Sequence, residues 1–168
     1  RMTIAAAALA LAATGFADPA AAQNEQFIPA NFYWVGPYAP GGSGFGGGMI
    51  DYFAMLNERD GGINGVKITY EECETGYATD KGVECYERLK GKNGGATVFH
   101  PLSTGITFAL TEKAPADRIP IITAGYGRSE STDGNVFKWN FPLTGTYWDA
   151  ADILLLNNSA LTADFIGI

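Results

Sequence analysis

The sequence predicts an α/β protein built on one open parallel sheet with helices on both faces. One observation is that apolar segments of strand length alternate with segments of helical periodicity between residues 33 and 123. A second is that turns rich in glycine or polar residues separate these segments. The order β-α-β-α-β-α-β favours parallel strands, because each helix returns the chain to the same edge of the sheet.

The opening βαβ unit lies within residues 33–70. A short apolar strand beginning at Tyr33 leads into a glycine-rich loop at 36–48, which we expect to approach a ligand closely. A helix follows, because five apolar residues recur with helical spacing and form one stripe: Met49, Ile50, Phe53, Ala54 and Leu56. Gly61 favours the end of this helix, and the second strand at 66–70 alternates between apolar and polar residues.

Further strands and helices continue the alternation toward the C-terminus. The expected elements, in chain order, are a helix with Thr79 as its N-cap, a strand at 96–99, a helix capped by Ser103 or Thr104, a strand at 119–123, a strand at 136–141 ended by Pro142, and a helix over about 147–156. The last helix carries four consecutive apolar residues, Ile153 to Leu156, which need a partner surface.

The N-terminus has the pattern of a secretory signal peptide. Arg1 precedes an apolar run at 4–16, and small residues at 20–22 precede a polar segment. We therefore expect export, with residues 1–22 removed by cleavage. A membrane anchor or a buried alanine-rich helix is the alternative, although the apolar run is short for a bilayer span.

Composition and charge narrow the function classes. The 168-residue chain is 46% hydrophobic, enough for one domain with a core, and its formal charge is −7. Loss of residues 1–22 removes Arg1 and Asp18, one charge of each sign, so the mature chain keeps the charge of −7. An acidic surface argues against nucleic acid and anionic membranes as partners, and we expect no stable membrane insertion.

Cysteine and histidine are scarce. Cys73 and Cys85 are the two cysteines, and an even count in an exported chain favours a disulfide over two buried thiols. Together with the one histidine, His100, they form a poor metal set, so no metal is expected. For His100 a strand-end position satisfied by backbone is favoured over a catalytic role. No nucleophile, base and orienting acid assemble from the sequence, so we expect neither an enzyme nor a cofactor.

Ligands of open parallel sheets bind outside the carboxyl ends of the strands, where loops lead into helices. Three such loops are candidates here. The loop at 36–48 has Phe45 as its one large side chain, the loop at 100–104 carries two hydroxyl groups, and the third loop covers 123–128.

The glycine-rich segment also contains the spacing GxGxxG, at Gly42, Gly44 and Gly47, which is typical of dinucleotide sites. In that motif the first glycine directly follows the strand, whereas residues 37–41 intervene here. Nicotinamide enzymes are also uncommon among exported proteins, so this interpretation is disfavoured.

Six segments, taken together, resemble the type I periplasmic substrate-binding proteins of ABC transporters, in particular the leucine/isoleucine/valine-binding group. They are VGPYAPGGSGFGGG, LNERDGGINGVKI, YEECET, VFHPLST, IPIITAGYG and VFKWNFP. The resemblance covers roughly Trp34 to Leu156. It implies a Rossmann-like three-layer lobe within a two-lobed protein that closes on a solute and delivers it to an ABC permease.

The resemblance also implies a ligand site in the three loops, formed by Phe45, Ser103, Thr104, Gly125, Tyr126 and Gly127. Ser103 matches the serine that holds a ligand's α-carboxylate, and Phe45 matches an aromatic wall of the pocket. Gly127 stands where the family has a threonine that binds both ligand termini, and Tyr126 replaces a small residue. Amides, aromatic acids and other carboxylates are therefore alternatives to a branched-chain amino acid.

The resemblance implies a periplasmic location, an N-terminal ligand-binding lobe at 23–143 and the start of a second lobe at 144–168. The family's first cysteine matches Cys73, while Leu102 stands at the usual position of its partner, so a shorter bridge to Cys85 is implied. The alternative function is an exported enzyme or a receptor-type sensor domain on a similar α/β scaffold.

Overall fold

Parallel strands form the centre of the fold. The computed structural model describes residues 25–123 and 129–166. Strand β1 (Glu25–Phe32) pairs in parallel with β2 (Lys67–Glu74) along its whole length. The last six residues of β1 are buried, as expected for a parallel strand covered on both faces, whereas burial alternates along β2.

The sheet continues beyond β1 through residues 96–99. This segment bridges Phe27 of β1 at one end and Ile121 at the other, in parallel in both cases. Strand β3 (Ile121–Thr123) then pairs in parallel with β4 (Asn140–Pro142). The order across the sheet is therefore β2, β1, segment 96–99, β3 and β4, which confirms the predicted open parallel arrangement.

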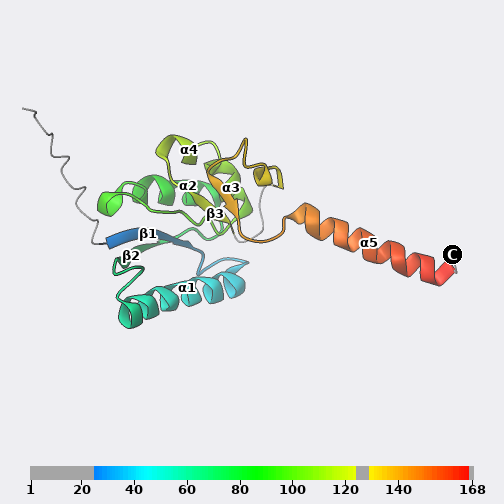
Figure 1. Cartoon of the computed structure of the whole chain (residues 1–168), viewed down its shortest axis with the longest axis horizontal. Helices are drawn as coiled ribbons and strands as arrows, with labels where there is room; N and C mark the ends of the chain where they lie inside the picture. Colours follow the sequence, from blue (N-terminus) through cyan, green and yellow to red (C-terminus); the bar gives the residue numbers. More distant parts are fainter. Residues whose placement is uncertain (1–24, 124–128, 167–168) are drawn as a thin grey trace, which may run out of the picture.

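Helices cover both faces of this sheet (Figure 1). The long helix α1 (Ala39–Asp60) lies on one face, and α2 (Thr79–Leu89) and α3 (Thr104–Leu110) lie on the other. The remaining short elements are α4 (Ala114–Asp117) and 3₁₀ turns at Lys92–Gly94 and Ser129–Thr132. The predicted cap of α3 by Ser103 is confirmed. Thr79 was predicted as the N-cap of α2, but it is the first residue of that helix, and Ala78 occupies the cap position without a side-chain bond.

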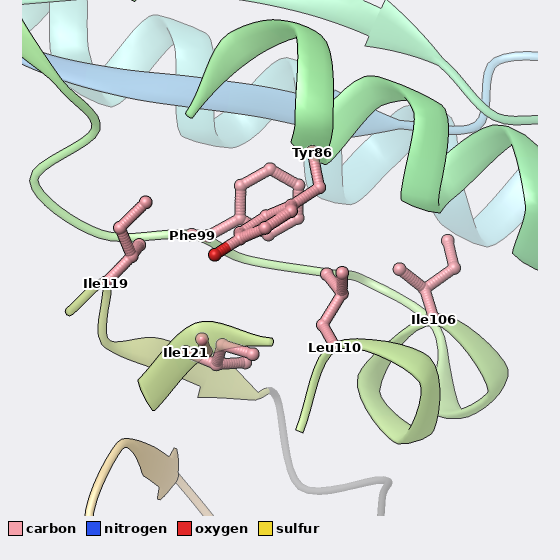
Figure 2. Close-up of a cluster of buried hydrophobic side chains, with 7 residues drawn as sticks. Tyr86, Phe99, Ile106, Leu110, Ile119 and Ile121 are labelled. Carbon is pink, nitrogen blue, oxygen red and sulfur yellow. The ribbon is translucent and has the colours of Figure 1, made fainter. Parts of the chain in front are cut away.

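One buried cluster holds α2 and α3 against the sheet (Figure 2). Its members are Tyr86, Phe99, Ile106, Leu110, Ala114, Ile119 and Ile121. The rings of Tyr86 and Phe99 meet edge to face with their centroids 5.0 Å apart. Burial of each large apolar side chain contributes about 1.5–3 kcal/mol of transfer free energy. The Tyr86 hydroxyl donates to Asp117 over 2.9 Å, so its polar atom is paired.

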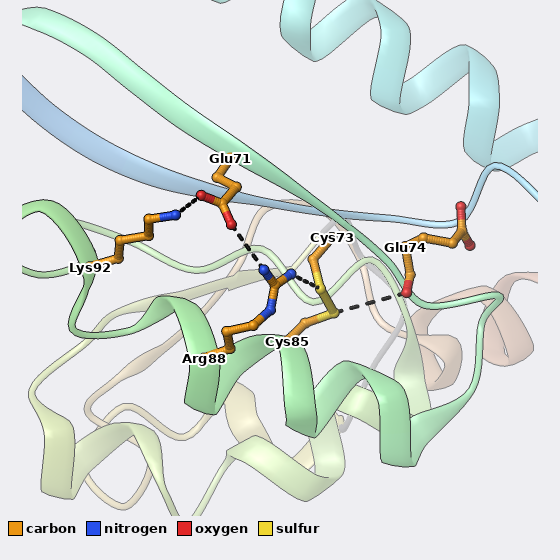
Figure 3. A network of polar contacts seen from close by, with 6 residues as sticks. All are labelled: Glu71, Cys73, Glu74, Cys85, Arg88 and Lys92. Atoms are coloured by element: carbon orange, nitrogen blue, oxygen red, sulfur yellow. Dashed lines mark hydrogen bonds and ion pairs between the residues drawn. A yellow bond between two sulfur atoms is a disulfide. The ribbon is translucent and has the colours of Figure 1, made fainter.

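A disulfide between Cys73 and Cys85 ties the end of β2 to α2, which confirms the predicted bridge (Figure 3). Arg88 lies beside it, donating to Cys73 Sγ over 2.8 Å and pairing with Glu71 over 2.9 Å. Lys92 also pairs with Glu71, and this contact holds the pKa of that carboxyl below its usual value. Solvent reaches these ion pairs and screens them, so the covalent bond is the main link between β2 and α2.

Two predicted boundaries near the start of the fold are wrong. The first strand ends at Phe32 instead of beginning at Tyr33. Helix α1 begins at Ala39, so the glycines between residues 41 and 48 belong to a helix and not to a loop. The apolar stripe predicted farther along is part of this same longer helix.

The C-terminal part also differs from the prediction. Strand β4 is shorter than the expected 136–141, because residues 133–137 form a hydrogen-bonded turn. Helix α5 (Tyr147–Ile166) is longer than expected and extends away from the α/β body (Figure 1). The side chains of Ile153, Leu154 and Leu156 in α5 are largely exposed, so the described part of the chain does not cover them.

Candidate functional site

Two adjacent strands send the chain to opposite faces of the sheet. The chain that leaves β1 enters α1 on one face, whereas the chain that leaves segment 96–99 enters α3 on the other (Figure 1). Such a switch point opens a crevice at the carboxyl ends of the two strands, which is the usual ligand position in open α/β sheets. By this rule the expected ligand position lies between residues 33–38 and residues 100–103, and we call it the switch-point crevice.

Two glycines allow α1 to approach β1 beside this crevice. A Cβ on Gly42 would lie 2.1 Å from a ring carbon of Tyr33, and a Cβ on Gly46 would lie 3.0 Å from the rings of Phe32 and Trp34. These glycines therefore serve helix–strand packing. The prediction that a glycine-rich loop brings backbone amides close to a ligand is wrong for residues 39–48, because these residues belong to α1.

Phe45 of α1 packs against His100 at the end of segment 96–99. The ring centroids lie 5.2 Å apart, with the rings tilted by 39°. Phe45 is 39% exposed, whereas His100 is 7% exposed. The structure thus brings together the first and second candidate segments, and the exposed aromatic ring offers an apolar surface at the switch-point crevice.

His100 supports the loop that follows it. Its Nδ1 accepts the backbone N–H of Leu102 over 3.1 Å. Leu102 has a φ of 50°, a left-handed conformation that is costly for a residue with a bulky side chain. Burial lowers the pKa of His100 to about 4, so the imidazole is neutral near pH 7. The prediction of a strand-end histidine satisfied by backbone is confirmed for Nδ1 alone, because the buried Nε2 has no hydrogen-bond partner in the described part of the chain.

Ser103 caps α3, as predicted. Its Oγ accepts the backbone N–H of Ile106 over 3.4 Å, and the residue is 2% exposed. From β1, Asn31 Nδ2 donates to Pro101 O over 2.9 Å and fixes the same loop. The hydroxyl that the resemblance assigns to a ligand carboxylate is therefore buried and bonded to its own helix.

Thr104 is the first residue of α3, and its hydroxyl lies 3.2 Å from the hydroxyl of Tyr147 in α5. Phe45, Ser103 and Thr104 are thus brought to one edge of the sheet. The other predicted ligand residues, Gly125, Tyr126 and Gly127, lie outside the described residues.

Tyrosines outside the predicted site pack together beyond the carboxyl ends of β1 and β2. Tyr77 packs against Tyr33 and Tyr38, with ring centroids 5.0 Å and 4.4 Å away. Tyr77 has a φ of 65°, so it is a second bulky residue in the left-handed conformation at this edge. Glu74 joins the two loops, since its carboxylate accepts the backbone N–H groups of Trp34 and Gly76 over 2.7 and 2.6 Å. Correct strand ends would have placed Tyr33 directly after β1 and Tyr77 in the loop that follows β2.

The described part of the chain shows neither a metal centre nor a membrane span. No group of three or more His, Cys, Asp or Glu side chains in it could hold a metal ion. None of its helices is both long and apolar enough to cross a bilayer. A hollow of about 490 Å³ lies on the C-terminal half of α1, away from the crevice, and is lined by Asp51, Ala54, Met55, Glu58 and Arg59.

Comparison with known proteins agrees with this geometry. A family model described as periplasmic binding protein matches residues 25–155. The chain belongs to the periplasmic binding protein family. The resemblance predicted from the sequence is thereby confirmed, and so is the α/β fold of a type I binding-protein lobe.

Solved structures are similar to this periplasmic binding protein. An ABC transporter permease from the Pseudomonas fluorescens group is 46% identical, with a TM-score of 0.72, over 79% of this chain and 32% of that one. A branched-chain amino acid transporter substrate-binding protein from Streptococcus pneumoniae, in complex with isoleucine, is 21% identical, with a TM-score of 0.63, over 73% and 34%. A solute-binding protein of an ABC transporter from Rhodopseudomonas palustris, in complex with benzoate, is 20% identical, with a TM-score of 0.58, over 73% and 33%.

The binding protein described here therefore spans about a third of the length of these solved structures. No curated protein matches it in sequence.

Proposed function

We propose that the protein is the solute-binding component of an ABC importer. The observation that carries this proposal is the match of residues 25–155 to the periplasmic binding protein family. The protein captures a branched-chain amino acid, or a related small carboxylate or amide, in the periplasm and delivers it to the ABC permease subunits. It performs no chemistry on the solute and needs no cofactor.

The proposed ligand site is the switch-point crevice, formed by Phe45, Ser103, Thr104, Gly125, Tyr126 and Gly127. The exposed ring of Phe45 supports the assignment of an apolar wall. Two of the solved relatives hold isoleucine and benzoate, which are both small carboxylates with an apolar part. This shared chemistry supports the proposed class of solute and leaves the individual solute to experiment.

The same proposal includes export and a second lobe. Residues 1–22 form a cleaved signal peptide, residues 23–143 form the first lobe, and residues 144–168 begin the second. Strand β1 begins at Glu25, directly after the proposed mature N-terminus, which supports this division. Helix α5 extends away from the α/β body, as a connection into another lobe does.

Thermal unfolding of the full-length protein tests the function. Leucine, isoleucine, benzoate and small amides are added in series, with glucose as the control. A solute that binds only the native state stabilises it by about 2.7 kcal/mol at a concentration of 100 Kd, so the midpoint rises with concentration. A midpoint that no carboxylate or amide raises contradicts the proposal. Chemical conversion of a solute, followed by NMR, favours an enzyme instead.

A further inference from the structure

Within the described part of the chain, three buried side-chain atoms have no hydrogen-bond partner: Asn31 Oδ1, Thr69 Oγ1 and His100 Nε2. Thr69 lies in the middle of β2, whereas Asn31 and His100 lie near the carboxyl ends of β1 and of segment 96–99. Native proteins keep few such atoms, because burial of a polar group without a partner is costly. Two of the three therefore flank the switch-point crevice.

The unpartnered atom of His100 is a donor. Because Nδ1 accepts the backbone N–H of Leu102, the proton of the neutral imidazole resides on Nε2. Burial keeps the imidazole neutral by lowering its pKa to about 4. His100 thus offers one N–H group beside the crevice and carries no positive charge.

The ring of Phe45 is the exposed neighbour of this donor. It packs on the imidazole at a centroid distance of 5.2 Å and is 39% exposed, whereas Nε2 itself is buried. Movement of one partly exposed ring is a smaller change than movement of the buried loop around Leu102. A solute that displaces the ring of Phe45 therefore comes into contact with the imidazole of His100.

We propose that the Nε2–H of His100 donates a hydrogen bond to an oxygen atom of the bound solute and selects for that group. The inference rests on the proposed function, because it assigns a contact within the same crevice. A carboxylate or carbonyl oxygen accepts this bond, whereas an ammonium group is itself a donor and gains nothing from a neutral N–H. The part of the solute beside Phe45 and His100 is therefore a hydrogen-bond acceptor.

Two substitutions separate a contact with the solute from support of the loop. His100→Asn keeps a polar atom near the position of Nδ1, so it can still bond Leu102, but it has no atom near Nε2. His100→Gln places an amide N–H near the position of Nε2. Thr69→Val is the matched control, since it removes another unpartnered buried atom from a strand interior outside the crevice.

Calorimetry of the full-length protein with isoleucine, benzoate and the rest of the solute series gives the test. We expect His100→Asn to bind the wild-type solute about ten- to a hundredfold more weakly, since a hydrogen bond to a charged group is lost. His100→Gln should recover part of the affinity, and Thr69→Val should match the wild type. Unchanged affinity in His100→Asn overturns the proposal that His100 donates a hydrogen bond to the solute, and it leaves the proposed function intact. Failure of the wild type to bind any of these solutes overturns the function itself.

A second readout excludes a merely structural role. The imidazole nitrogen signals of ¹⁵N-labelled protein, assigned through their loss in His100→Asn, should show a protonated Nε2. We expect this Nε2–H signal to shift when the solute is added. A signal that stays unchanged at saturation overturns the inference even where His100→Asn weakens binding.

Discussion

Gly42 illustrates how a single residue can support two different predictions. Its glycine-rich surroundings suggest a loop, because residues without Cβ are tolerated where the backbone bends or approaches a ligand. In the structure the residue lies inside α1, where the ring of Tyr33 occupies the space that a Cβ would fill. The sequence shows which positions lack a side chain, but the occupant of the neighbouring space depends on how α1 packs on β1.

Substitution of glycines along α1 should therefore have opposite effects on stability. Gly42→Ala should lower the free energy of unfolding by about 1–3 kcal/mol, because the added carbon overpacks the contact with Tyr33. Gly44→Ala, where an added Cβ meets no heavy atom within 4 Å, should raise it by about 0.5–1 kcal/mol, because alanine is the better helix former. Urea unfolding followed by circular dichroism measures both. Equal effects of the two substitutions would show that α1 does not press on β1 at Gly42.

His100 should make stability depend on pH. Its pKa is about 4 in the folded protein against 6.5 for the free side chain, so the unfolded chain binds more protons between these values. The free energy of unfolding should therefore rise with pH from about 4 to about 6.5, by at most about 3 kcal/mol, and this group should add nothing further above that range. Urea unfolding at pH 5 and pH 7 gives the difference. His100→Asn should reduce it, and an unchanged difference would show that other groups cause it.

At the scale of secondary structure elements, local signals predicted α2 and α3 well. Ser103 caps α3 as predicted, and Thr79 lies one residue inside its predicted cap position at the start of α2, because both helix starts depend on residues adjacent in the sequence. Strand β1 was misplaced, because it is paired on both edges by β2 and by segment 96–99 and covered on both faces by helices, all of which lie farther along the chain. The cap was thus predictable, while the crevice beside it required the sheet order.

The cap of α3 allows stability and binding to be separated at Ser103. Ser103→Ala removes the capping bond and should cost about 0.5–2 kcal/mol of stability, whereas Ser103→Gly should cost only a few tenths. Both remove the hydroxyl, so under the proposed function both should weaken binding of a carboxylate solute by about 1.5–3 kcal/mol. Urea unfolding and calorimetry of the two variants provide the comparison. Wild-type affinity in Ser103→Gly would remove the hydroxyl from the ligand site.

At the scale of the whole molecule, the described chain consists of a covered sheet and a helix that leaves it. The core on the α2 and α3 side contains Phe99 and Ile121, which have no exposed surface. Helix α5 is the opposite case, since Trp148 is 69% exposed and Leu156 is 69% exposed. The apolar residues of the sequence predicted that this helix packs against a partner surface, but they do not indicate where that surface lies.

The exposed side of α5 should make an isolated chain of residues 25–168 associate. Ile153, Leu154 and Leu156 are 59%, 64% and 69% exposed on one helix, and such a patch favours burial against another molecule. Light scattering over a concentration series should show species larger than a monomer. The double substitution Ile153→Lys and Leu156→Glu keeps the net charge, adds polar groups to the patch and should restore the monomer.

The full-length protein, in which we propose that a second lobe covers this helix, should be monomeric. It should also bind solute more tightly than the isolated chain in equilibrium dialysis, because two lobes enclose a solute that one lobe leaves in contact with water. In light scattering, a monomeric isolated chain would mean that α5 folds back onto its own sheet. In equilibrium dialysis, equal affinity in both proteins would mean that the first lobe binds solute alone.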